Sequence, residues 1–187
     1  EYCPKTVHSL LDNAIRRKEP LAERDILNIF TSAAAALTHL HSHGLAHRDV
    51  KIENLLFSSE SNGQRVKLCD LGSCSSDHRS LRNSTEIGYA QEDIEKHTTL
   101  AYRSPEQVDL YSKKTIGPPV DIWALGVLLY KLCWWRTPFE DKAGVVQPMA
   151  ILNGTYTAPP SLPIPGTNGQ QTFPPYSPGI LTLLRAC

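Results

Sequence analysis

A short polar stretch lies between two apolar segments and carries the residues best suited to chemistry. It reads H-R-D-V-K-I-E-N from His47 to Asn54, so ionisable and hydrogen-bonding side chains follow one another closely. If the stretch is a loop, Asp49, Lys51 and Asn54 can converge on one point. Asp49 would accept a proton from an attacking hydroxyl, and Lys51 would offset charge on a transferring phosphoryl group. The amide oxygen of Asn54 would bind Mg²⁺.

A second carboxylate for the same metal ion follows a predicted β-hairpin. Residues 55–57 and 66–69 are short apolar runs, and the segment between them is rich in Ser, Asn and Gly, which is typical of two antiparallel strands. The second run leads into Asp70-Leu71-Gly72. We expect the hairpin to fix the distance between Asn54 and Asp70, so that both side chains reach one metal ion.

These patterns resemble the catalytic loop and the metal-binding loop of eukaryotic protein kinases. Ser104-Pro105-Glu106 stands where that family has Ala-Pro-Glu, and residues 121–126, D-I-W-A-L-G, are similar to its D-x-W-x-x-G helix start. Four signatures in this order are specific, whereas a single D-x-G is not. Leu71 replaces the usual Phe and Ser104 replaces Ala, and neither change removes a reacting group. The resemblance implies a mainly helical large lobe of the α+β kinase fold, with a short β-hairpin that carries the two loops.

One branch of the family is especially similar. Residues 96–106, 109–112 and 121–135, followed by T-P-F at 137–139, resemble the Numb-associated and actin-regulating kinases. This implies a serine/threonine kinase that transfers the γ-phosphate of ATP to Ser or Thr hydroxyls of proteins, and Lys51 agrees with that specificity. It also implies endocytic adaptors or actin regulators as partners, and a cytoplasmic location at cortical actin or endocytic sites.

The resemblance also gives each motif residue a role. Thr99 would bridge Asp49 and Lys51. His47 would tie the catalytic loop to the D-x-G segment, and Asp121 would brace the backbone of the loop. The predicted catalytic residues are Asp49, Lys51, Asn54, Asp70 and Thr99; those predicted to bind ATP are Glu1, Cys3, Lys51, Glu53, Asn54, Leu56 and Asp70; and those predicted to bind Mg²⁺ are Asn54 and Asp70.

The adenine-binding part of this assignment depends on the first residues of the chain. Glu1 and Cys3 resemble hinge positions whose backbone pairs with adenine. Leu56 corresponds to the apolar floor beneath the adenine ring, although an ordinary core leucine is nearly as compatible with the sequence.

The resemblance covers residues 1–187 as a partial kinase domain. Within it we expect a hinge, the large lobe, an activation segment at about 70–106 and a Pro-rich insertion at about 157–179. We expect truncation at both ends, so that the small β-rich lobe is absent, Glu106 lacks its usual Arg partner and the chain alone has no kinase turnover. The alternative is a catalytically silent fragment or pseudokinase that acts as a protein-interaction module.

Hydrophobic periodicity predicts the elements that must position these residues. Apolar residues recur at helical spacing over 7–17 and over 22–43, where Gly44 would end the helix. Residues 122–135 are apolar on nearly every side, which predicts a helix buried at the centre of the lobe. Residues 161–178 are rich in Pro, Gly and Gln, which predicts a mobile loop and leaves a proline-motif ligand as an alternative.

The segment from 72 to 100 is polar and weakly periodic, as expected of an exposed, regulated activation segment. Thr98 and Tyr102 are either phosphorylation sites or solvated loop hydroxyls, and the second interpretation is favoured. His39, His41 and His43 could suggest a metal site, but a polar helix end explains them better.

Composition excludes several classes of function. The 187 residues include 19 basic and 19 acidic side chains, so net charge gives no reason to expect binding to nucleic acid or to an acidic membrane. Five scattered cysteines without a C-x-x-C pair favour reduced thiols over disulfides or a zinc site. No apolar run approaches the roughly 20 residues of a transmembrane helix.

Overall fold

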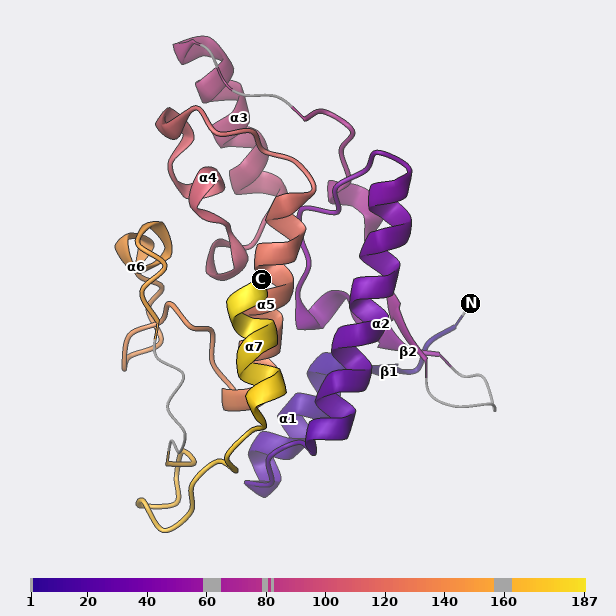
Figure 1. Cartoon of the computed structure of the whole chain (residues 1–187), viewed down its shortest axis with the longest axis vertical. Helices are drawn as coiled ribbons and strands as arrows, with labels where there is room; N and C mark the ends of the chain where they lie inside the picture. The colour runs from indigo at the N-terminus through magenta and orange to yellow at the C-terminus, as the bar shows by residue number, and fades with distance from the viewer. Residues whose placement is uncertain (1, 59–64, 79–80, 82, 157–162) are drawn as a thin grey trace.

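The computed structural model describes residues 2–58, 65–78, 81, 83–156 and 163–187 (Figure 1). Helices dominate it, as the sequence predicts, and the described strands form one small antiparallel sheet of order β1-β2-β3. The helices and strands are β1 (Lys5–Thr6), α1 (Val7–Arg17), α2 (Glu23–Ser42), β2 (Leu55–Phe57), β3 (Val66–Leu68), α3 (Ser84–His97), α4 (Pro105–Val108), α5 (Pro119–Trp134), α6 (Pro148–Leu152) and α7 (Pro178–Ala186).

Helix α1 has the predicted bounds because both of its ends are capped. At its start, Thr6 Oγ1 accepts a hydrogen bond from the Ser9 N–H, and Ser9 Oγ accepts one from the Thr6 N–H. At its end, Lys18 adopts the left-handed conformation, with φ of 57°. Arg16 and Arg17 in the last turn lie where the helix dipole favours positive charge.

The core is built around α5, which packs between α2 and α7 (Figure 1). Twelve of its sixteen residues are buried, so its apolar surface is covered on nearly all sides, as predicted. Helix α2 contributes an apolar stripe at i, i+3, i+4 and i+7 spacing. That stripe consists of Ile26, Ile29, Phe30, Ala33 and Leu37.

The predicted hairpin is present, and a third strand joins it. Strands β2 and β3 pair in antiparallel register with Leu55 opposite Leu68, and β1 pairs with the other edge of β2. Beyond the ladder, the Cys69 N–H donates to the Asn54 carbonyl at 2.9 Å. The hairpin therefore pairs Asn54 with Cys69, so that Asp70 directly follows the residue bonded to Asn54, as expected.

The activation segment contains a regular element that its weak periodicity did not predict. Residues 84–97 form the 14-residue helix α3, and most of its residues are exposed, in agreement with the expected exposure. Asn83 caps it by accepting the Glu86 N–H, and Ile87 and Ile94 on one face pack with Leu110 in a small cluster that is separate from the main core. A short amphipathic stripe on an otherwise polar helix is a weak sequence signal, which explains why it was missed.

Several residues of the predicted loop at 161–178 pack against the core, although most of 163–178 is exposed; 161 and 162 lie outside the described residues, and the mobility of the loop stays a prediction. Phe173 is only 2% exposed and contacts the Trp135 ring edge-to-face at 4.8 Å between centroids. The Tyr176 hydroxyl donates to the Cys133 carbonyl, and the Ser177 hydroxyl and N–H donate to the Glu23 carboxylate. Aromatic anchors thus attach to the core a segment whose prolines exclude regular structure.

Replacing Phe173 by Ala should lower the free energy of unfolding by about 3–5 kcal/mol, because removal of this large side chain would leave a cavity against Trp135. Thr172→Ala, at an exposed neighbouring position, should change it by less than about 0.5 kcal/mol. Urea unfolding of the two variants would measure both values. Equal stabilities would show that this loop does not contribute to the core.

Candidate active site

A buried carboxylate on α5 fixes the backbone of the catalytic loop. Asp121 is fully buried, and its Oδ2 accepts the His47 N–H while its Oδ1 accepts the Arg48 N–H, both at 2.7 Å. Arg48 adopts a φ of +72°, a conformation that L-residues rarely occupy. The two charge-assisted hydrogen bonds to Asp121 offset the cost of that strain. The predicted bracing role of Asp121 is thus present in the structure.

His41 supplies a third contact to the same carboxylate. Its Nε2 lies 2.8 Å from Asp121 Oδ2, so this ring joins the end of α2 to the start of α5. His43 bonds through Nδ1 to the carbonyl of His39, one helical turn earlier. The histidines at the end of α2 therefore have partners of their own.

His47 connects the catalytic loop to the D-x-G segment, as predicted. Its Nε2 lies 3.1 Å from the Cys69 carbonyl, and its Nδ1 lies 3.3 Å from the Asp49 N–H. Because the Asp49 N–H can only donate, Nδ1 must accept and Nε2 must carry the proton. The imidazole thus has a defined tautomer, and it holds Asp49 and the residue before Asp70 on opposite sides of one ring.

The Asp49 carboxylate is the centre of the polar cluster. It is 7% exposed, its Oδ2 lies 2.6 Å from Lys51 Nζ, and its Oδ1 accepts the Thr99 hydroxyl at 2.8 Å. Lys51 Nζ also donates to Thr99 Oγ1 at 3.0 Å. Thr99 therefore bridges the two charged residues from the far end of the activation segment. The three side chains form a closed ring of hydrogen bonds that fixes the direction of the carboxylate.

Asn54 and Asp70 have the donor atoms that Mg²⁺ requires. Asn54 Nδ2 donates to the Asp49 carbonyl at 2.8 Å, which leaves its amide oxygen for a metal ion. Asp70 has left-handed backbone angles, and its exposed carboxylate accepts the Gly72 N–H weakly at 3.4 Å. Mg²⁺ is usually held by one or two protein oxygens together with phosphate oxygens, so the two side chains fit it.

The residues predicted to bind the nucleotide are only partly described. Glu1 lies outside the described residues, and Cys3 is half-buried just before β1. Leu56 is half-buried in the middle of β2, between two buried neighbours. Because side chains alternate along a strand, Leu56 faces away from the core. This orientation leaves it free to form the floor of a pocket.

Glu53 points away from the Asp49 cluster. Its Oε1 lies 4.0 Å from His8 Nε2 and 3.9 Å from Lys131 Nζ, at the limit for ion pairs. These contacts link the loop to α1 and α5. Its predicted part in binding ATP stays a prediction.

The interpretation of Thr98 and Tyr102 as solvated loop hydroxyls is wrong. Tyr102 is 4% exposed, and burial raises the pKa of its phenol, so it is neither solvated nor accessible for modification. Thr98 Oγ1 donates to the Ile94 carbonyl and accepts from Arg103 Nε, which ends α3. Glu106 has no ion-pair partner in the described part of the chain, but it is only half-buried, which reduces the expected cost.

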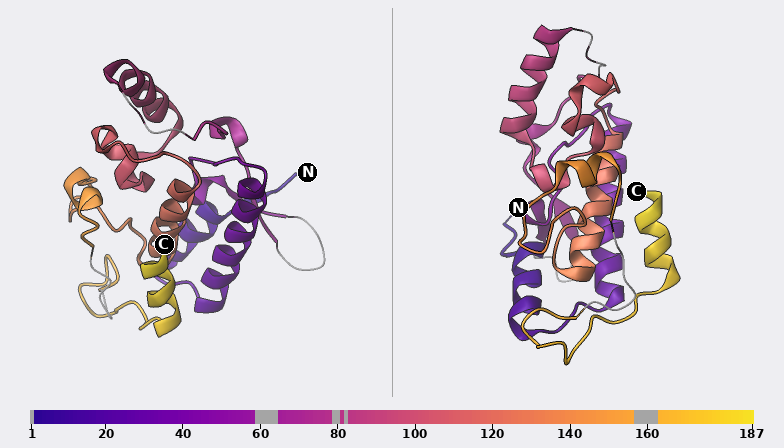
Figure 2. Two further views of the ribbon diagram at one scale, coloured as in Figure 1. Left: turned by 45° about the horizontal axis from the view of Figure 1, so that its top comes forward. Right: turned by 90° about the vertical axis from the view of Figure 1, so that its left-hand side faces the viewer.

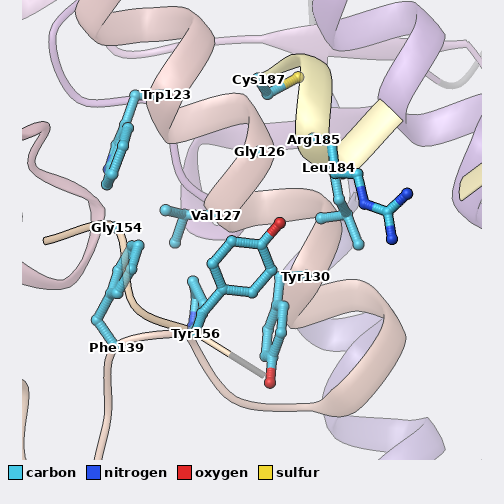
Figure 3. Close-up of a pocket in the computed structure, with 11 residues that line it drawn as sticks. Trp123, Gly126, Val127, Tyr130, Phe139, Gly154, Tyr156, Leu184, Arg185 and Cys187 are labelled. Carbon is cyan, nitrogen blue, oxygen red and sulfur yellow. The ribbon is translucent and has the colours of Figure 1, made fainter. Parts of the chain in front are cut away.

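A separate apolar cavity of about 350 Å³ lies between α5 and α7 (Figure 3). The parallel rings of Trp123 and Phe139 form one wall, with Tyr130 and Tyr156 beside them and Cys187 near the opposite side. None of its lining residues belongs to the Asp49 cluster. The chemistry of the site and this cavity are therefore in different parts of the molecule.

Comparisons with known proteins show the family to which the chain belongs. A sequence model of the protein kinase domain matches residues 1–186. The chain belongs to the protein kinase family. Within the described residues, no helix is both long and apolar enough to cross a membrane.

Curated kinases from several organisms are similar to this kinase chain. It is 43% identical to Actin-regulating kinase 1 and 41% identical to Actin-regulating kinase PRK1 of Saccharomyces cerevisiae, over 85% and 91% of the chain. It is 40% identical to Serine/threonine-protein kinase sel-5 of Caenorhabditis elegans, over 87% of the chain. The alignments span 24%, 19% and 15% of those proteins, respectively.

Sequence reasoning missed three members of the kinase site. The sequence indicates a polar helix end rather than a metal site at His41, and it assigns no role to the side chain of Arg48 or to Asp93 on α3. For Asp93, the signal that could have been used is the sequence pattern of helix α3. Asn83 followed by Glu86 three residues later is a capping pattern, and apolar residues at 87, 90 and 94 follow at helical spacing.

Asp121→Asn should disorder the catalytic loop. An amide has one oxygen, so it cannot accept all three donors, and its NH₂ group would face an N–H. We expect a loss of at least about 1–3 kcal/mol in the free energy of unfolding, and faster hydrogen exchange at the His47 and Arg48 amides. Asp12→Asn, half-exposed on α1 beside His8 and remote in sequence from the loop, is the control. Slow exchange retained in Asp121→Asn would contradict the bracing role.

Proposed function

We propose that this chain is the large lobe of a serine/threonine protein kinase, with Asp49 as the proton acceptor. The observation that carries the proposal is the ring of hydrogen bonds among Asp49, Lys51 and Thr99. The ring fixes the direction of the buried Asp49 carboxylate and holds the Lys51 ammonium group beside it. Phosphoryl transfer to a hydroxyl needs both groups: a carboxylate that takes up the proton of the hydroxyl, and a positive charge beside the transferring phosphoryl group.

Each residue has a distinct part in the proposed reaction. The acceptor hydroxyl gives its proton to Asp49 as its oxygen forms a bond to the γ-phosphorus of ATP, and the bond to the bridging oxygen breaks to release ADP. Lys51 lies within 2.6 Å of Asp49 and offsets negative charge on the transferring group. Asn54 and Asp70 would hold Mg²⁺, which neutralises charge on the phosphate oxygens when bound.

The substrate class follows from Thr99 and Lys51. The resemblance to serine/threonine kinases links Lys51, and a threonine that bridges it to Asp49, to transfer to Ser and Thr hydroxyls, and Thr99 makes that bridge here. The serine/threonine kinases to which the chain is similar also support Ser and Thr acceptors. Since the site's four charged or metal-binding positions are all occupied by competent residues, nothing in the described cluster favours the silent interaction module.

Asp49→Asn, in the protein with its native flanking sequence, should reduce transfer of labelled phosphate from Mg-ATP to Ser/Thr peptides by about 10²–10⁴-fold, because the proton acceptor is lost. Peptides with Tyr as the only acceptor should remain unlabelled. Asp25→Asn, half-exposed on α2, is the control and should retain activity. Unchanged labelling by Asp49→Asn would overturn the assignment of the base.

We also propose that the substrates are endocytic adaptors or actin regulators, at cortical actin or endocytic sites in the cytoplasm. This is supported by the similarity to two kinases named as actin-regulating. Comparing phosphorylated proteins from cells with wild-type kinase and with Asp49→Asn would test it. We expect such proteins to be over-represented among Ser/Thr sites that lose phosphate. Their absence from that set would contradict the proposed substrates.

A further inference from the structure

The side chain of Arg48 has a role apart from the contact of its backbone with Asp121. Its Nε donates to the Ser73 carbonyl at 2.8 Å, and its Nη1 donates to Asp93 Oδ2 at 2.6 Å. Only 14% of this side chain is exposed, and a guanidinium removed from water requires a carboxylate partner. Asp93 is the one ion-pair partner of Arg48 in the part of the chain that the structure describes.

Asp93 is in turn held by its own helix. His97, one turn later on α3, places Nδ1 2.8 Å from Asp93 Oδ1, so both carboxylate oxygens have partners. Partial burial alone raises the pKa of Asp93, but the hydrogen bonds and charge of Arg48, with a contribution from His97, outweigh this and lower it. The carboxylate is therefore ionised at neutral pH, opposite a permanent positive charge.

This ion pair lies close in sequence to the catalytic ring. Helix α3 ends at His97, Thr98 closes its last turn, and Thr99 follows at once with its hydroxyl on Asp49. Any shift of the end of α3 relative to Arg48 would move Thr99 with it. The residue that meets Arg48 thus lies six positions before the residue that meets the proton acceptor.

Among the described residues, α3 is held to the rest of the molecule by Arg48, by hydrogen bonds from Arg103 near its end, and by one small apolar cluster. It stands at one end of the chain's fold (Figure 2), and its apolar face packs in the small cluster of Leu81, Ile87, Ile94 and Leu110 rather than in the main core. A helix with so small an apolar contact is expected to open locally more readily than α2 or α5. The Arg48–Asp93 ion pair is the charged link between this helix and the catalytic loop.

We propose that Asp93 is a positioning residue, whose ion pair with Arg48 keeps Thr99 on Asp49 without a phosphoryl group on the activation segment. Its effect on catalysis rests on the proposed function. Activation segments of kinases can be ordered by a phosphorylated residue that pairs with Arg. In this chain, the Asp93 carboxylate on α3 already pairs with the Arg48 guanidinium.

The test compares Asp93→Asn with Glu92→Gln, its exposed neighbour on the same helix, in the protein with its native flanking sequence. We expect kcat of Asp93→Asn to fall by about tenfold to a hundredfold, because Thr99 and Asp49 lose their alignment. The KM for ATP should stay within about twofold, since no proposed nucleotide contact changes. Asp93→Glu should recover part of kcat, and Glu92→Gln should match wild type.

Hydrogen exchange over residues 94–101 gives a readout that is independent of activity. Asp93→Asn should exchange faster there than wild type and Glu92→Gln. Faster exchange supports the anchoring role even if wild-type protein shows no turnover, in which case the proposed kinase function alone fails. Exchange and kcat both equal to wild type would overturn the proposal.

Phosphatase treatment of wild-type protein tests the second half of the proposal, and it needs no variant that must fold. After complete removal of phosphate, confirmed by mass spectrometry, slow exchange over 94–101 and kcat should be retained. A loss of either would show that a phosphoryl group, and not Asp93, orders the segment.

Discussion

The organisation of this molecule depends on one carboxylate that has no access to water. A fully buried charge is stable only when hydrogen-bond donors surround it, and Asp121 meets this requirement with two backbone N–H groups and one imidazole. Those donors belong to the catalytic loop and to α2, so the helix that forms the centre of the core also determines the path of the loop. The strained backbone of Arg48 is the local consequence of this arrangement.

The loop that Asp121 fixes in turn positions the catalytic side chains through polar contacts. The braced loop orients the His47 ring, which holds the backbone of Asp49 and the end of β3. Asp49 then receives Lys51 from its own loop and Thr99 from the activation segment. Each step includes a contact between segments that are distant in sequence: His47 with Cys69, and Asp49 with Thr99. A buried apolar helix thus supports a polar site.

The sequence was sufficient where one local signal determined the structure. Periodicity and caps predicted α1, α2 and α5, and two apolar runs around a Ser/Asn/Gly-rich turn predicted the hairpin. The resemblance to protein kinases implied the bracing Asp121 and the bridge by Thr99. The sequence was insufficient where several weak contacts act together. The stripe on α3 covers only a few residues, Phe173 contacts an aromatic ring 38 positions away, and the partner of Arg48 lies 45 residues along the chain. Such pairings depend on the three-dimensional path of the chain, which local sequence does not contain.

The contact between Glu23 and Ser177 also bears on the order in which the fold is completed. Glu23 lies in the first turn of α2, and its carboxylate accepts two hydrogen bonds from a residue 154 positions later. During synthesis on the ribosome, α2 can form early, but this contact cannot form until the chain as far as Ser177 has emerged. Until then the side of α5 that α7 covers remains open to water. The nascent chain therefore passes through a stage in which a chaperone that binds apolar segments would find its principal target on the central helix.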